Sequence, residues 1–147
     1  MQVGHRRLLL LGGALALALA VMFGIRAYFG ATGKSPGGRN FDEPYLQGLA
    51  GKLNAKLPRM VSPEGRLDHV EAGPGKRVRF SYTLTGHDAA EIKELLTPDV
   101  IAQGRKAMCS VPDLAEAVAD GVRMEAVYAG NDGKPAFEFV MNRGDCG

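Results

Sequence analysis

The chain has 147 residues, which leaves room for one ordinary domain after a leader, because single domains commonly occupy about 100 to 200 residues. Hydrophobic residues make up 46% and charged residues 23%, which excludes a disordered chain and a multispanning membrane protein. The formal net charge is +2, but the first 30 positions hold three basic residues and no acid, so residues 31–147 carry 15 basic against 16 acidic residues. This balance argues against nucleic-acid binding.

Residues 1–29 predict a membrane segment. An uncharged apolar run extends from Leu8 to Ile25, and its 18 residues are just long enough to cross a hydrocarbon core of about 30 Å. Arg6 and Arg7 precede the run, and flanking positive charge keeps that end of a membrane helix in the cytoplasm. We therefore expect a single-pass anchor in the inner (cytoplasmic) membrane, with the remaining chain in the periplasm.

The alternative is a signal peptide cleaved after Ala20. Ala18-Leu19-Ala20 has the small-x-small form of a cleavage site. The apolar run continues beyond this point to Ile25, which favours retention as an anchor. Both interpretations export the same domain, so the expected compartment does not depend on the choice.

Residues 30–41 are rich in glycine, with one proline, and predict a flexible linker between the anchor and a domain over 42–147. A helix is expected to begin near Pro44, with Asp42 and Glu43 at its positive end, and to stop at Pro58. Its apolar positions recur at helical spacing.

Two hairpins and a helical segment complete the domain. Alternating residues predict strands over 66–72 and 77–84 around a Gly73-Pro74-Gly75 turn, and strands over 122–129 and 136–141 around Asn131-Asp132-Gly133. Between them we expect helices from His87, from Pro98 after a Thr97 cap, and over 113–119. The predicted fold class is α+β: a four-stranded antiparallel sheet with helices on one face, in the order helix, hairpin, two or three helices, hairpin.

The two cysteines, Cys109 and Cys146, are expected to form a disulfide, because an exported domain folds in an oxidising compartment. Metal binding would need two further ligands at suitable spacing, and the sequence places none beside either cysteine.

Several short motifs, taken in order, resemble a pattern in small, mostly uncharacterised bacterial envelope proteins with an N-terminal anchor. The resemblance covers residues 44–146 and implies an envelope location and an α+β fold, with no catalytic residues to transfer. The motifs are Leu53-Asn54, Leu57-Pro58, Arg66-Leu67-Asp68, Gly73-Pro74-Gly75, Tyr82-Thr83-Leu84, Cys109, Gly121-Val122, Tyr128, Asp132-Gly133 and Cys146.

No catalytic residue, cofactor or metal site is predicted. Asp68-His69 lies in a strand, where neighbouring side chains point to opposite faces, so Asp68 is poorly placed to orient His69. His87-Asp88 is typical of a helix start. A small envelope hydrolase that uses His69 or His87 remains the enzymatic alternative.

One group of basic residues is a candidate binding surface: Arg66, Lys76, Arg77 and Arg79 are expected to gather on the outer face of the first hairpin. Such charges most often keep an exposed sheet face soluble, and the functional interpretation is a docking surface for an acidic partner, such as anionic lipid headgroups or another envelope protein. The leading hypothesis is a non-enzymatic interaction, assembly or inhibitor-type module. A structural accessory subunit that assembles through its leader helix is the other alternative.

Overall fold

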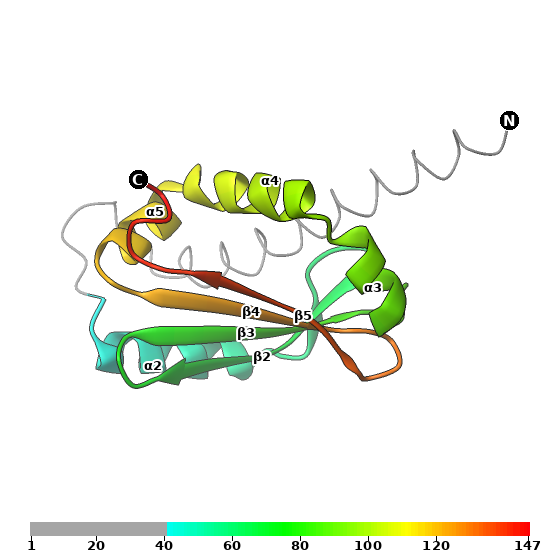
Figure 1. The fold of residues 1–147 in the computed structure, drawn as a ribbon. Helices are drawn as coiled ribbons and strands as arrows, with labels where there is room; N and C mark the ends of the chain where they lie inside the picture. Colours follow the sequence, from blue (N-terminus) through cyan, green and yellow to red (C-terminus); the bar gives the residue numbers. More distant parts are fainter. Residues whose placement is uncertain (1–40) are drawn as a thin grey trace, which may run out of the picture.

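The computed structural model describes residues 41–147 (Figure 1). The predicted membrane segment, including Arg6 and Arg7, and the linker up to residue 40 lie outside the described residues. Within 41–147, no helix combines the length and the apolar character that crossing a membrane requires. The elements, in chain order, are α2 (Glu43–Asn54), β1 (Arg59–Met60), β2 (Gly65–Gly73), β3 (Arg77–Leu84), α3 (Ala89–Leu95), α4 (Pro98–Cys109), α5 (Pro112–Ala119), β4 (Arg123–Ala129) and β5 (Pro135–Met141).

The strands form one five-stranded sheet in the order β1-β2-β3-β4-β5. Both predicted hairpins are present, as β2-β3 and β4-β5, but the expectation of a four-stranded antiparallel sheet is wrong in two respects. A short strand, β1, adds a fifth member, and β3 pairs with β4 in parallel, with Phe80 opposite Ala126. The three helices between β3 and β4 supply the long crossover that a parallel pair requires.

Helix α2 ends earlier than Pro58, at Asn54. The Asn54 side chain donates a hydrogen bond to the carbonyl oxygen of Val70 at 2.6 Å and accepts one from the Val70 amide at 2.9 Å. These two bonds attach the end of α2 to β2. The chain then turns through a cis Leu57–Pro58 peptide bond into β1, where Met60 pairs with Arg66.

The core lies on one face of the sheet, between the strands and the helices. In β3, Val78, Phe80, Tyr82 and Leu84 are buried, and the alternate residues form part of the opposite face, which we call the polar face. Buried residues of all four helices join the same cluster, so the predicted placement of the helices on one face is confirmed. Phe41 is fully buried, so the core begins one residue before the predicted domain start.

Side chains cap the starts of α2, α3 and α4, and the cap predicted at Thr97 is among them. Asp42 accepts a hydrogen bond from the amide of Tyr45 at 2.9 Å, and Asp88 accepts one from Glu91 at 2.9 Å. Thr97 accepts a longer bond, 3.4 Å, from the amide of Val100. Each side chain therefore satisfies an amide that has no partner within its helix.

The disulfide between Cys109 and Cys146 is confirmed, with a Cα–Cα distance of 5.2 Å. Cys109 ends α4, and Cys146 lies in the tail that follows β5. An ion pair supports the same connection, because Arg105 Nη1 lies 3.2 Å from Asp145 Oδ2 and also donates to the carbonyl oxygen of Val140. The C-terminal tail is thus fixed to α4 by covalent and polar contacts.

Candidate functional site

The four residues of the predicted basic patch are spread along the first hairpin, with Arg66 opposite Thr83 at one end and Lys76 and Arg77 at the other. Arg66 is on β2, and Arg77 and Arg79 are on β3, at positions that alternate with the buried residues. Lys76 occupies the turn between these strands, with a φ of 56°. Lys76, Arg77 and Arg79 are therefore near one another, whereas Arg66 lies at the other end of the hairpin.

Each of the four cations is paired with a carboxylate. The contacts are Arg66 with Asp68, Lys76 Nζ with Asp120 Oδ2 at 3.1 Å, Arg77 Nη2 with Glu71 Oε1 at 3.7 Å, and Arg79 Nη2 with Glu138 Oε1 at 3.5 Å. Opposite charges therefore alternate across the polar face, which weakens its attraction for a charged partner.

Glu125 lies at the centre of this arrangement. Its side chain is only 6% exposed, and its carboxylate contacts Arg79 Nε at 3.7 Å and Arg123 Nε at 3.0 Å. The parallel pairing of β3 with β4 places Glu125 directly opposite Arg79. Sequence reasoning missed this residue, because its partner can be identified only once the two hairpins are paired in the correct direction.

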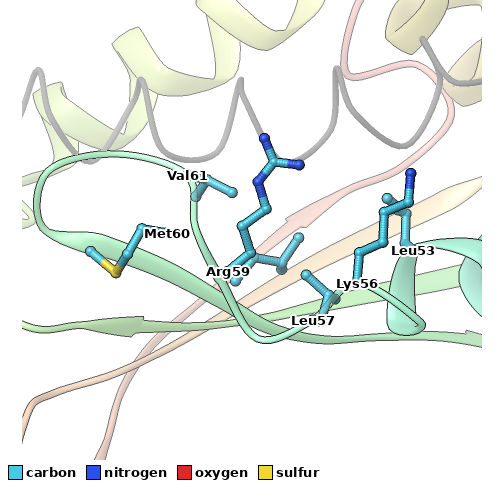
Figure 2. A pocket seen from close by; sticks show the side chains of 7 residues that line it. Leu53, Lys56, Leu57, Arg59, Met60 and Val61 are labelled. Atoms are coloured by element: carbon cyan, nitrogen blue, oxygen red, sulfur yellow. The ribbon is translucent and has the colours of Figure 1, made fainter.

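A second region, which the sequence did not identify, lies at the β1 edge of the sheet. It is a pocket of about 240 Å³ that we call the β1 groove (Figure 2). Its lining comes from the end of α2 and the turn after it, from β1 and its following residue, and from the buried side of β2. The lining residues are Leu53, Lys56, Leu57, Arg59, Met60, Val61 and Leu67.

The groove combines an apolar surface with a basic rim. Lys56 and Arg59 are exposed, and neither has an ion pair within residues 41–147. Figure 2 shows both side chains extending to the same side of the groove. Met60 is 47% exposed, and no other large hydrophobic residue among residues 41–147 is exposed to this degree. The signal in the sequence was an apolar run interrupted by bases, Lys56-Leu57-Pro58-Arg59-Met60-Val61.

The two histidines of the domain lie in different surroundings. His69 is exposed on β2, while Asp68 is held by Arg66 and by the Thr83 hydroxyl. His87 contacts two carboxylates, with Nε2 3.2 Å from Glu64 and Nδ1 3.0 Å from Glu91. Residues 41–147 contain no cluster of three or more His, Cys, Asp or Glu side chains that is suited to a metal ion.

Two tyrosines lie buried in the core behind these surfaces. The rings of Tyr82 and Tyr128 stack with centroids 5.2 Å apart. Burial raises the pKa of both hydroxyls well above the usual value of 10, and for Tyr82 the neighbouring Tyr128 adds to the effect. The Tyr82 hydroxyl has no hydrogen-bond partner among the described residues. Both groups stay protonated at physiological pH and act as core side chains.

Comparison of the sequence with protein families and with curated proteins finds no match. Solved structures do share the fold. A protein from Pseudomonas aeruginosa described as secreted has a TM-score of 0.58 and 16% identity, over 76% of this chain and 100% of that one. The pilotin EpsS of the Vibrio vulnificus type 2 secretion system has a TM-score of 0.55 and 12% identity, over 71% and 91%. The type II secretion system pilotin AspS of Vibrio cholerae has a TM-score of 0.52 and 13% identity, with the same coverage.

Proposed function

We propose that this protein is a non-enzymatic assembly module of the bacterial envelope. Residues 8–25 hold it in the inner membrane, Arg6 and Arg7 keep its N-terminus cytoplasmic, and residues 42–147 face the periplasm, where they bind another envelope protein. The observation that supports this proposal most strongly is the fold that the domain shares with two type II secretion pilotins and with the Pseudomonas aeruginosa protein described as secreted. The Cys109–Cys146 disulfide is consistent with an oxidising compartment.

An assembly role also suits a membrane-tethered domain of this size. Tethering raises the effective concentration of a binding surface toward partners in the same envelope layer, so modest affinity is sufficient. The domain offers two candidate surfaces, the polar face with Arg66, Lys76, Arg77 and Arg79, and the β1 groove.

The proposal is tested by affinity capture of the tagged full chain from detergent-solubilised membranes of the source organism. The matched control keeps residues 1–41 and carries an unrelated disulfide-bonded domain in place of 42–147. We expect at least one envelope protein to be enriched reproducibly with the full chain and lost with the control. Identical recoveries from the two chains would overturn a binding role for the domain.

Two additional chains separate the alternatives. Exchange of residues 8–25 for an unrelated anchor should leave capture intact, whereas an accessory subunit that assembles through its leader would lose its partner. The Arg77→Glu/Arg79→Glu variant tests the polar face directly, and loss of capture there would assign the partner to that surface. The N-terminal sequence of the purified chain distinguishes a retained anchor from cleavage after Ala20.

A further inference from the structure

We propose that the β1 groove is the partner-binding site of this domain, and that it accepts an acidic protein segment which inserts an apolar side chain between α2 and β1. This inference rests on the proposed function for the existence of a protein partner. It goes further in naming the surface and the chemistry of the partner.

The size and lining of the groove favour a side chain as the occupant. Its volume of about 240 Å³ is below the roughly 300 to 1,000 Å³ that is typical of small-molecule sites. The surface within it is formed by Leu53, Leu57, Val61 and Leu67, which offer contacts to an apolar group. An anchor residue that fills a small apolar pocket is the common centre of a protein interface.

The positive charge beside the groove indicates that the partner segment is acidic. Lys56 and Arg59 lie beside the apolar lining and have no carboxylate partner within residues 41–147, unlike the cations of the polar face. Lys52 is also exposed on α2, without an ion pair in the described chain. A segment that carries Asp or Glu beside its apolar anchor would complement this rim, and such complementarity speeds association and suppresses incorrect partners.

Two other occupants fit less well. The leader and linker of the same chain contain no acidic residue from 1 to 40, and Lys34 and Arg39 would be repelled by the basic rim. A lipid surface would require apolar side chains that protrude, whereas this site is concave and only Met60 combines large apolar area with high exposure among the described residues. The groove therefore matches an acidic protein segment better than its own linker or a membrane.

The test places a photoreactive amino acid, benzoylphenylalanine, at Met60 in the full chain and irradiates membranes of the source organism. A matched probe replaces His69, which is exposed on β2 and away from the groove lining. We expect the probe at Met60 to cross-link an envelope protein through an acidic segment with an apolar residue, mapped by mass spectrometry. The probe at His69 should give little of the same product.

Charge reversal tests the rim. Lys56→Glu/Arg59→Glu should lower the cross-linked yield by about tenfold or more, which corresponds to about 1.4 kcal/mol of binding free energy. The control variant Lys93→Glu/Lys134→Glu makes the same change of net charge at two exposed positions outside the groove, and should stay within about twofold of the unaltered chain. Changing the acidic residues of the mapped segment to lysine should restore binding to the charge-reversed groove.

The outcomes separate this inference from the proposed function. Cross-links from Met60 only to lipid, only to a second copy of this chain, or to a protein whose yield is unchanged in Lys56→Glu/Arg59→Glu would overturn the inference. A partner cross-linked from His69 and not from Met60 would overturn the groove and leave the assembly role in place. If neither probe cross-links a protein and affinity capture also recovers none, both proposals fail.

Discussion

The polar face and the β1 groove use the same residue types in opposite ways. On the polar face, Arg79 contacts Glu125, which the neighbouring strand β4 places opposite it, and Arg66 contacts Asp68 on its own strand. At the groove, Lys56 and Arg59 have no such partner within residues 41–147 and lie beside apolar side chains. Charges that are already paired contribute mainly to the fold, whereas unpaired charges beside an apolar surface remain available to a partner. The arrangement of cations is therefore more informative than their number.

The largest expected effect comes from a feature distant from both regions. Cys109→Ser/Cys146→Ser should lower the free energy of unfolding by about 4 kcal/mol, because the disulfide closes a loop of about 38 residues and restricts the unfolded chain. Urea unfolding of the full chain in detergent measures this loss. The bond lies beyond the Met124–Met141 end of the sheet, on the strand edge opposite β1, so the unaltered groove should still bind its partner. A loss below about 1 kcal/mol would contradict the expectation.

Truncation of the buried Leu67 and of the exposed Met60, both in the lining of the β1 groove, should change stability by different amounts. Leu67→Ala removes a buried side chain and should cost about 3 kcal/mol of stability, through lost apolar contact and the cavity it leaves. Met60→Ala should change stability by less than about 0.5 kcal/mol, because Met60 is exposed, and should weaken partner binding instead. Equal losses of stability in the two variants would show that Met60 belongs to the core and not to a binding surface.

The two buried tyrosines should make the free energy of unfolding fall at alkaline pH. The pKa of Tyr82 and of Tyr128 is raised in the folded state, so their contribution to stability is complete well below pH 10, the midpoint at which unfolded tyrosine ionises, and is lost as the pH rises through it. We expect a loss of about 2 kcal/mol between pH 10 and 11, to which the two residues contribute about equally. Tyr82→Phe should halve this slope in urea titrations.

The same variant provides a check at neutral pH. Because the Tyr82 hydroxyl is buried without a hydrogen-bond partner among the described residues, its removal should be neutral or slightly stabilising. A loss of more than about 1 kcal/mol at pH 7 would show that the hydroxyl makes a favourable contact.

Small losses of stability are expected on the polar face. Glu125→Ala leaves Arg79 and Arg123 without their shared carboxylate and should cost about 1 to 2 kcal/mol, less than a fully buried pair because both arginines are partly exposed. Glu138→Ala is the control: this carboxylate is about half exposed, and its loss should stay within about 0.5 kcal/mol. Urea unfolding at low and high salt measures both. Equal losses of stability in the two variants would show that burial of Glu125 adds nothing to the strength of its ion pairs.

Local features of the fold could be predicted from the sequence, because they depend on neighbouring residues. The alternation in residues 77–84 predicts β3, and Asp88 and Thr97 mark helix starts that the structure confirms. The parallel pairing of β3 with β4 depends on where three intervening helices return the chain. Strand β1 has two residues, too few for any periodicity.

In the candidate sites, too, contacts between residues near in sequence could be predicted, and contacts between distant residues could not. The neighbours Lys76, Arg77 and Arg79 are close in sequence, and their proximity was predicted. The carboxylate partner of Arg77, Glu71, is also near in sequence, but Lys76 and Arg79 pair with carboxylates that follow the three helices between β3 and β4. The β1 groove likewise combines Leu53 of α2 with Leu67 of β2, which come together only after the domain folds.

The disulfide also determines how the domain responds to mechanical load. A pull on the chain from its N-terminal side acts first on α2, whose last turn is held to β2 by the two Asn54–Val70 hydrogen bonds. The segment between Cys109 and Cys146 cannot lengthen under that load, because its ends are covalently joined. Extension is therefore confined to the part of the chain before Cys109, which contains the β1 groove. Tension on a membrane tether would deform the groove before it disturbed β4 and β5.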